Sequence, residues 1–290
     1  MPVDYEVCNR INVAGVLMDI HPDNLWVEYG TFVSDEAGRE PDVSVRCVAA
    51  GSIKKPAGKI VSDGHYQWIA HADDQHRISV AYSRANEFYR PEVLVSSTRE
   101  WKNVSIKYKD NCSQTRFDVG TALGAVVFAS KLLFLNGLVI HASAIKLNGR
   151  AIVLSAPSGT GKSTQAKLWA THRGVTILND DTPCLRVENG EVQAYGTPWC
   201  GSKNIFVNDS APVSAIVVLE QGKENVVRKL SAEETVSRFL PRCFLPYHDT
   251  QFMKAALAIF EKVISRVPVY LYSCRPDSSA VDYLEEQLAL

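Results

Sequence analysis

The sequence lacks an excess of charge of either sign and lacks any long apolar run. Its 290 residues hold 31 Lys and Arg against 32 Asp and Glu, a formal net charge of −1. This balance offers no bulk electrostatic attraction, so we expect neither a nucleic acid nor a membrane surface as partner. The longest apolar stretch, residues 121–135, is interrupted by Lys131 and is too short to span a membrane, which favours a buried core helix.

The sequence also lacks the cysteine spacing of a zinc-binding or disulfide-bonded protein. Its seven cysteines are odd in number, scattered, and include no Cys-x-x-Cys pair, so reduced thiols are expected. Residues 1–10 carry acids and no apolar core, which predicts no signal peptide. Together these features favour a cytoplasmic protein. With 46% hydrophobic and 22% charged residues, the composition is that of a globular chain, long enough for two modest domains.

Residues 1–115 have the pattern of a β-rich module. Short alternating or apolar segments separated by polar turns predict strands at residues 43–48, 66–70, 77–82 and 104–108. His65, His71 and His76 lie close in sequence, but their spacing fits no metal-ligand pattern, so surface histidines are favoured. No catalytic constellation is visible in this part. We expect the module to flank a site, to pack against it or to recognise a partner.

The most informative stretch is residues 154–164, which read Leu-Ser-Ala-Pro-Ser-Gly-Thr-Gly-Lys-Ser-Thr. An apolar run at residues 151–154 predicts a buried strand before the turn, and residues 165–173 predict a helix after it, with Gly174 at its C-cap. Strand, Gly-rich turn, Gly-Lys-Ser and helix are the parts of a phosphate-binding P-loop. Ala156 stands where the usual consensus has glycine, and a bare Gly-x-Gly-Lys-Ser also occurs in surface loops. The flanking strand and helix favour a nucleotide site.

Each part of this loop has a physical task in binding phosphate. Gly159 and Gly161 allow the backbone to curl so that successive N–H groups face an anion, and the following helix adds its positive end. Lys162 supplies a charge for the outer phosphates, and the Ser163 hydroxyl is placed to bind magnesium. The predicted nucleotide-binding residues are Ser158, Gly159, Thr160, Gly161, Lys162, Ser163 and Thr164.

A hairpin is predicted to bring His141 to this loop. Residues 138–147 and 150–156 are two strand-like runs joined by Asn148 and Gly149. Asn-Gly is the strongest short hairpin signal, because both turn positions need a positive φ. With a two-residue loop, His141 faces the first residue of the phosphate loop. The alternative is a histidine whose hydrogen bonds are satisfied within the core.

An apolar strand is predicted at residues 175–179, and it ends in Asp180 and Asp181. Magnesium-nucleotide chemistry needs carboxylates at the edge of a sheet, one to hold the metal and one to take a proton from an attacking hydroxyl. Adjacent acids at a strand end point to opposite faces, so they need not share a role. The alternative is an exposed turn. The sequence alone does not assign the two roles.

A second Asn-Gly pair, at residues 189–190, predicts a hairpin that folds residues 196–203 back towards the two carboxylates. This segment is rich in glycine and proline and carries Trp199 and Lys203, which makes it a candidate substrate loop. Lys203 fits a solvated surface lysine equally well.

The remainder of the chain alternates strand and helix. Strands are predicted at residues 213–219, 226–230 and 267–273, and helices at residues 231–241, 249–266 and from 277 onwards. The first of these helices opens with a capping box, Ser-Ala-Glu-Glu. Arg238 and Arg242 lie four apart on its face, where they reach either phosphate or solvent.

Three of these motifs together resemble a known family. His141-Ala142-Ser143, the loop Pro-Ser-Gly-Thr-Gly-Lys-Ser-Thr and Asn179-Asp180-Asp181 are similar to motifs of the kinases related to HPr serine kinase/phosphorylase. The nucleotide fold of that family resembles that of phosphoenolpyruvate carboxykinase. The resemblance implies an α/β (α+β) fold, with a mixed-sheet P-loop kinase core of the HPr kinase C-terminal type in residues 116–290, following the β-rich N-terminal module.

The resemblance also implies an activity and roles for single residues. Lys162 would hold the outer phosphates of ATP, Ser163 and Asp181 would bind Mg²⁺, Asp180 would be the base and His141 would line the phosphate site. The expected activity is phosphorylation of serine in a peptide or protein. Family members assemble into oligomers, which implies a homo-oligomer here. The alternatives are a small-molecule hydroxyl kinase, acting on free serine or a sugar, and a nucleotide-sensing module without turnover.

Two departures from the family pattern limit what the resemblance implies. The bifunctional enzymes look to have an acidic residue within the loop, where this chain has Pro157. They also carry a Glu-Ile-Arg-Gly run downstream of the aspartate pair, and that run has no counterpart here. We therefore do not carry over phosphorylase activity, or HPr itself as the substrate.

Overall fold

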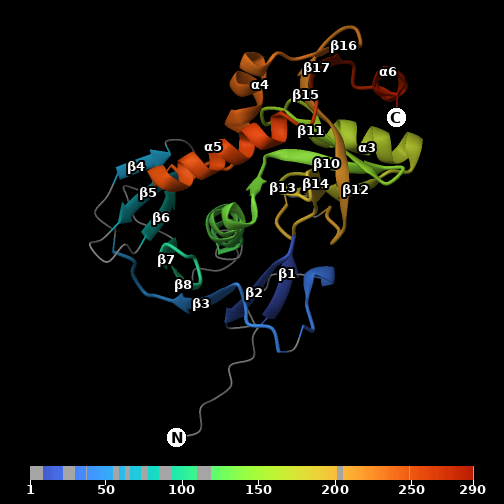
Figure 1. Cartoon of the computed structure of the whole chain (residues 1–290). Coiled ribbons are helices and arrows are strands. Elements are labelled where there is room, and N and C mark those ends of the chain that lie inside the picture. Colours follow the sequence, from blue (N-terminus) through green and yellow to red (C-terminus); the bar gives the residue numbers. More distant parts are fainter. Residues whose placement is uncertain are drawn as a thin grey trace, which may run out of the picture. The chain divides into compact units, whose positions relative to one another are not determined.

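The computed structural model describes residues 9–21, 30–36, 38–54, 59–62, 66–72, 78–84, 93–109, 119–200, 205–247 and 249–289 (Figure 1). His65, His76 and Lys203 lie outside these residues, and so does the side chain of His71. The chain divides into two compact units. The first comprises Met1–Leu132 and Pro246–Met253, and the second Leu133–Leu245 and Lys254–Leu290. The predicted boundary after residue 115 differs from this division, because the helix that follows belongs to the first unit.

The first unit is built on an eight-stranded sheet in the order β1-β2-β3-β8-β7-β6-β5-β4. Its strands are β1 Asn9–Val13, β2 Val16–His21, β3 Val43–Ala49, β4 Lys59–Ser62, β5 Tyr66–Ala72, β6 Ile78–Arg84, β7 Val93–Ser97 and β8 Asn103–Tyr108. The β2–β3 and β3–β8 pairs are parallel, and the other pairs are antiparallel. The four strands predicted in this part are confirmed as β3, β5, β6 and β8, and with them its β-rich character.

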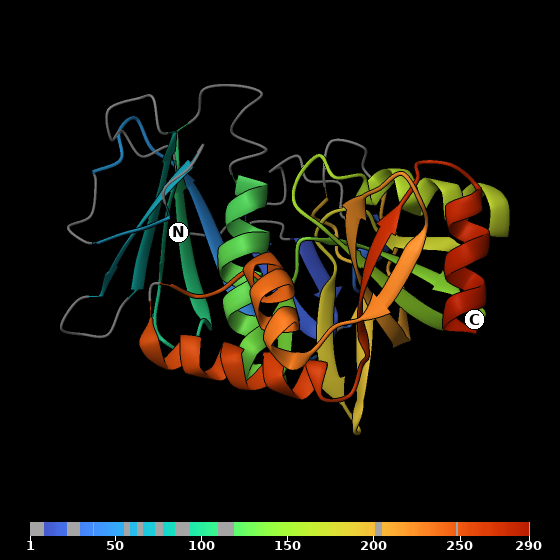
Figure 2. The same ribbon diagram turned by 90° about the horizontal axis from the view of Figure 1, so that it is seen from above.

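A helical segment follows this sheet and supplies part of its core (Figure 2, green). It contains a π-helix, η2 (Ala122–Phe128), which is followed by α2 (Ala129–Leu132) and by a short 3-10 turn, η3 (Leu133–Leu135). The predicted core helix over residues 121–135 is confirmed, because most of its apolar side chains, among them Leu123, are buried. In the part of the chain that the structure describes, each helix falls short of the length and apolarity that a bilayer crossing requires.

The second unit is built on a mixed sheet in the order β12-β10-β11-β15-β14-β13-β9, with β17 beside β15 and β16 beside β17. Its strands are β9 Gly137–Val139, β10 Ala142–Leu147, β11 Arg150–Ser155, β12 Thr176–Asn179, β13 Cys184–Glu188, β14 Glu191–Tyr195, β15 Ser210–Gln221, β16 Val226–Lys229 and β17 Val269–Cys274. The β11–β15 and β15–β17 pairs are parallel, whereas the other pairs are antiparallel. The prediction of a mixed sheet combined with helices is therefore confirmed.

The remaining helices lie near the predicted ranges, although the first of them begins three residues before the predicted start at residue 165. They are α3 Lys162–Arg173, α4 Ala232–Phe239 with the 3-10 turn η4 Leu240–Arg242, α5 Thr250–Ile264 and α6 Ser279–Leu288. The predicted capping box of α4 is present, since Ser231 accepts from the Glu234 amide and Glu234 accepts from the Ser231 amide. At α5, the Asp249 carboxylate accepts from the amides two and three residues later. These local hydrogen bonds satisfy the amides that a helix start leaves without partners.

The core of the second unit lies where α3 and α6 pack on the sheet. Trp169 of α3 and Leu284 of α6 are fully buried with Ile152, Leu154 and other residues of β11, β15 and β17. The two helices lie side by side (Figure 2), and Arg173 joins them through ion pairs of 2.6 and 2.7 Å to two carboxylates of α6. This packing fixes α3, and with it the loop before α3, against the end of β11.

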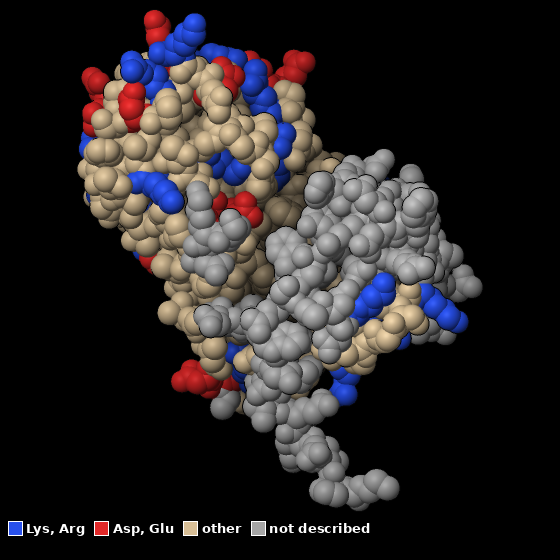
Figure 3. All heavy atoms as spheres, turned by 180° about the vertical axis from the view of Figure 1, so that it is seen from behind, with Lys and Arg blue, Asp and Glu red and all other residues tan. Residues whose placement is uncertain are grey.

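The described surface of the second unit carries charges of both signs. On the face shown in Figure 3, Lys and Arg side chains lie interspersed with Asp and Glu side chains.

Candidate phosphate-binding site

The β10–β11 hairpin has the register that the sequence predicts. Leu147 pairs with Arg150, and Ala142 pairs with Ser155. The two turn residues, Asn148 and Gly149, have φ values of 49° and 76°, as a two-residue Asn-Gly turn requires. The next residue on each side is His141 on one strand and the buried Ala156 on the other. The hairpin therefore brings His141 to the start of the glycine loop, by which we mean residues 156–161.

The glycine loop leads directly into α3, and its shape depends on two glycines. Gly159 and Gly161 have φ values of 78° and 115°, a backbone region that side chains with a Cβ rarely adopt. A Cβ at either position would meet no atom within 4 Å, so the space above the loop is open. Gly161 is also the N-cap of α3, where no side chain caps the helix. The first amides of α3 are thereby left for another acceptor, and a helix N-terminus favours an anion.

Lys162, the first residue of α3, places its ammonium group inside the site. The residue is only 7% exposed. Its Nζ donates to the Ala156 carbonyl at 3.0 Å and lies 2.9 Å from the His141 Nε2. Among the described residues, no carboxylate lies within ion-pair distance of this ammonium. Burial lowers the pKa of Lys162, the Asp181 charge opposes the shift, and the Arg242 charge adds to it.

His141 links Lys162 to one of the two predicted carboxylates. Its Nδ1 lies 3.3 Å from the Asp181 Oδ1, while its Nε2 faces the Lys162 ammonium. An ammonium group can only donate, so the Nε2 must accept and the ring proton belongs on the Nδ1, towards Asp181. Burial lowers the pKa of His141, and the Lys162 charge lowers it further, which favours this neutral ring. The structure thus brings His141, Lys162 and Asp181 together.

Asp180 and Asp181 follow β12, as predicted, and their surroundings differ. Asp181 has a side chain that is 32% exposed, whereas Asp180 is 3% exposed. The backbone of the pair is held to β10, because the Ser143 hydroxyl donates to the Asp180 carbonyl at 2.9 Å and the Ala142 amide donates to the Asp181 carbonyl at 3.0 Å. An ordinary exposed turn would not bury one of its two carboxylates, so the alternative of a solvent-exposed turn does not fit.

Asn179, the last residue of β12, joins the aspartate pair to the candidate substrate loop. Its Oδ1 accepts from the Asp181 and Thr182 amides at 2.8 and 2.7 Å. Its Nδ2 donates to the carbonyls of Thr197 and Trp199 at 2.9 and 2.8 Å. The side chain is fully buried. In the sequence, Asn179 stands out only as part of a motif. The signal for its structural role is an asparagine at a strand end, where the side-chain amide can close an Asx turn.

Residues 197–199 therefore fold back towards the carboxylates, as predicted. They are held there by hydrogen bonds to the Asn179 side chain and not by a continuation of the β13–β14 ladder. The β13–β14 ladder has the predicted register at its turn, and it ends at the Cys184–Tyr195 pair. Beyond it, Gly196 allows a close backbone approach: a Cβ there would lie 2.0 Å from the Val207 carbonyl oxygen and 2.6 Å from that of Leu178. Trp199 is 9% exposed.

Sequence comparison places the chain in a family. The family model described as SynChlorMet cassette protein ScmC matches residues 108–275, which is more than half of the chain. The chain belongs to the ScmC family. That match covers the hairpin, the glycine loop and the aspartate pair. Among curated proteins, none matches this ScmC-family chain.

Among solved structures, the ScmC-family chain is similar to the Hpr(Ser) kinase/phosphatase from Coxiella burnetii. The identity is 13% and the TM-score 0.30, and the match covers 52% of this chain and 99% of the other. Likeness at this level does not establish a shared fold. The HPr-kinase type of core that the sequence motifs imply therefore stays a prediction.

Proposed function

We propose that this ScmC-family chain is an ATP- and Mg²⁺-dependent kinase that phosphorylates a hydroxyl group, most simply that of a serine in a peptide or protein. One observation carries the proposal: the Lys162 ammonium is buried and is held by a carbonyl and an imidazole instead of a carboxylate. A buried cation without a paired anion favours an anionic ligand. It lies at a helix N-terminus that no side chain caps.

The residues of the glycine loop fit a nucleotide triphosphate. The loop has two positive-φ glycines with open space above them, and Pro157, Ser158 and Gly159 are exposed. Amides of such a loop, a helix N-terminus and a lysine are the groups that bind phosphate oxygens in P-loop proteins. In this proposal, residues 158–164 bind the phosphates and Lys162 neutralises the outer ones.

The residues around Asp181 fit Mg²⁺ as a partner of that nucleotide. Among the described residues, no three His, Cys, Asp or Glu side chains gather to hold a metal ion by themselves. Mg²⁺ is commonly held by one or two carboxylates together with phosphate oxygens, so a protein-only cage is not needed. Asp181 and the Ser163 hydroxyl are the residues that would hold it. Bound there, the ion neutralises charge on the phosphoryl oxygens.

The remaining groups would handle the acceptor. Asp180 takes the proton of the acceptor hydroxyl as the acceptor oxygen bonds to the γ-phosphorus; the bond from that phosphorus to the β–γ bridging oxygen breaks, and its electron pair leaves with ADP. His141 keeps Lys162 and Asp181 aligned. Asp180 is only 3% exposed. An acceptor hydroxyl can therefore reach its carboxylate only if residues that cover Asp180 move aside. Trp199 and Lys203 belong to the segment proposed to recognise the acceptor.

The proposal is tested by supplying ATP labelled with ³²P on the γ-phosphate, with Mg²⁺, to a cellular peptide fraction, to free serine and to water. Label on a peptide supports the proposal. Label on free serine alone redirects it to a small-molecule kinase. Nucleotide binding without transfer to any acceptor overturns it in favour of a sensing module.

Two variants test the assigned roles of the carboxylates in the same assay. Asp180→Asn is expected to bind ATP and Mg²⁺ as the wild type does and to lose transfer, because it keeps the shape but not the base. Asp181→Asn is expected to lose the Mg²⁺ dependence of ATP binding. The reverse pattern would exchange the two roles.

A further inference from the structure

A second cationic residue lies beside His141, on a segment far from the glycine loop in sequence. The His141 amide donates to the Arg242 carbonyl at 2.7 Å, and the Phe244 amide donates to the Val139 carbonyl at 2.9 Å. Ile140 and Cys243 form an antiparallel bridge between these two bonds. The backbone of Arg242, at the end of η4, is therefore fixed directly beside that of His141.

The side chain of Arg242 is not explained by the fold. Its Nε is buried and has no hydrogen-bond partner, and among the described residues no carboxylate pairs with its guanidinium. Buried donors normally find partners, and arginine carries five N–H groups in a fork that matches phosphate oxygens. Arg238, one helical turn earlier, shows the ordinary alternative, since it is exposed and lies 3.6 Å from Glu220.

The charge of Arg242 acts on the same two groups that face the glycine loop. It lowers the pKa of both Lys162 and His141, as a like charge close to them does. Arg242 therefore lies close to both Lys162 and His141, and His141 faces the Asp181 carboxylate at 3.3 Å. The two positive charges, on Lys162 and Arg242, repel each other, and an anion between them is expected to relieve that repulsion.

We propose that Arg242 is part of the phosphate site and donates to oxygens of the terminal phosphoryl group. This inference rests on the proposed function for the identity of the anion. Arg242 makes and breaks no covalent bond in this role. Its fork would hold the phosphoryl group that ADP lacks, which makes it a residue that distinguishes ATP from ADP.

The test is calorimetric binding of ATP, ADP and inorganic phosphate to the full chain, with Mg²⁺ present. Arg242→Gln is expected to weaken ATP binding about tenfold to a hundredfold, the size of one or two charge-assisted hydrogen bonds, and to leave ADP binding unchanged. Unchanged ADP binding also shows that this variant folds. Arg242→Lys is expected to restore part of the loss, because it keeps the charge and not the fork. Arg238→Gln is the matched control and should bind as the wild type does.

The outcomes separate this inference from the proposed function. If the wild type binds ATP and Arg242→Gln binds it equally well, or loses ATP and ADP alike, the role of Arg242 is overturned and the kinase proposal stands. If the wild type binds no nucleotide but binds inorganic phosphate in a way that Arg242→Gln abolishes, the anion site is supported and the kinase proposal fails. If the wild type binds none of the three, both fail.

Discussion

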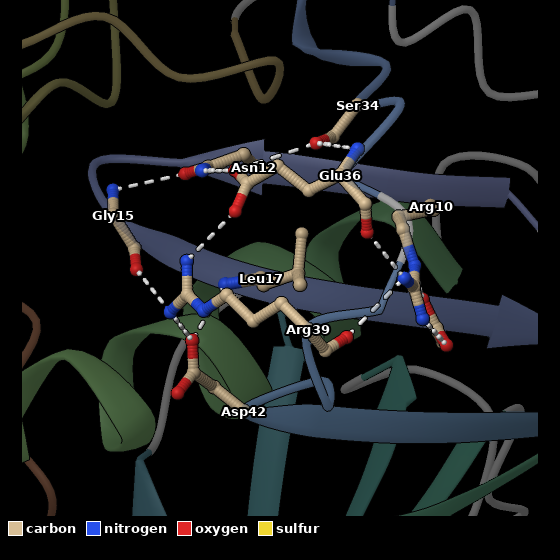
Figure 4. A network of polar contacts seen from close by, with 9 residues as sticks. Arg10, Asn12, Gly15, Leu17, Ser34, Glu36, Arg39 and Asp42 are labelled. Atoms are coloured by element: carbon tan, nitrogen blue, oxygen red, sulfur yellow. Dashed lines mark hydrogen bonds and ion pairs between the residues drawn. The ribbon is translucent and has the colours of Figure 1, made fainter.

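Two regions of this protein, one in each unit, hold their basic side chains in opposite ways. At the β1–β2 end of the first unit, Arg10 makes two hydrogen bonds of 2.7 Å to the Asp19 carboxylate and a third of 2.7 Å to the Glu36 carbonyl (Figure 4). Arg39 contacts the carboxylates of Glu36 and Asp42 at 3.3 and 2.7 Å. Both of these arginines have a carboxylate partner within the unit.

In the second unit, the site around the glycine loop has the opposite character. Lys162 is held by a carbonyl and an imidazole, and the Arg242 Nε is buried without a partner. Satisfied charges of the first kind stabilise a fold, whereas unsatisfied buried ones cost free energy that a ligand can return. A buried cation that the fold leaves without an anion is therefore where a ligand is expected to bind.

The largest effect is expected from removing the central cation of the second unit. Lys162→Ala should lower phosphoryl transfer by about 10²–10³-fold or more, because a preorganised group that stabilises charge in the transition state is lost. It should also weaken ATP binding. The assay is transfer from labelled ATP, and Lys167→Ala, on the exposed face of the same helix, is the control. Transfer at the wild-type rate in Lys162→Ala would contradict the assignment.

The next effect is expected from Asn179, which supports the site without a charge. Asn179→Ala leaves two amides and two carbonyls without their buried partner. The free energy of unfolding should fall by about 2–3 kcal/mol, and kcat should fall more than the affinity for ATP. Urea unfolding and initial rates measure the two. Asn225→Ala, whose hydrogen bonds lie at the surface, is the control. If the ATP affinity falls as much as kcat, Asn179 does not act mainly by holding the aspartate pair and the candidate substrate loop in place.

A smaller effect is expected at the paired charges of the first unit. Arg10→Gln breaks a half-buried ion pair whose side chains are 24% and 12% exposed. The free energy of unfolding should fall by about 1–2 kcal/mol, because charge-assisted hydrogen bonds are lost. Nucleotide affinity should not change, since this network takes no part in the proposed site. Chemical denaturation and calorimetry check both statements, and a loss of ATP affinity in the folded variant would break the comparison.

The smallest effect is expected from Arg39→Gln in the same network. Arg39 is 44% exposed, and solvent-exposed ion pairs contribute only about 0.2–1 kcal/mol. Its effect on unfolding should also shrink in high salt, because screening weakens surface pairs first. If Arg39→Gln lowers the free energy of unfolding as much as Arg10→Gln does, the difference in exposure does not determine how much each arginine contributes to stability.

The features that could be predicted from the sequence are those determined by interactions between residues close together in the chain. Asn148-Gly149 set the hairpin register, Gly174 ends α3, and Ser231 begins α4, each through hydrogen bonds or φ values within a few residues. The same hairpin brought His141 to the loop without any knowledge of the tertiary fold. Local chemistry therefore gave the glycine loop and most of its partners.

The features that were missed depend on contacts between distant segments. The sequence predicts that Arg242 reaches phosphate or solvent, but not its place beside His141. That place depends on residues 242–244 running beside residues 139–141, and no periodicity in the sequence specifies this pairing. The helical segment that ends at Leu132 was assigned to the second domain, since an apolar helix does not reveal which sheet it will cover; the structure groups it with the first unit. Asn179 could be picked out from the sequence as part of a motif, but its hydrogen bonds to Thr197 and Trp199, which follow β14, could not be predicted.

The most direct test of the central claim compares the two charged regions in one titration. In an amide NMR spectrum of the full chain, addition of ATP with Mg²⁺ should shift the signals of the glycine loop, of Lys162 and Ser163, and of His141 and Arg242, while those of Arg10 and Arg39 stay in place. That result would establish the unpaired cations as the nucleotide site. No shift at the glycine loop, or shifts centred on Arg10 and Arg39, would contradict the account.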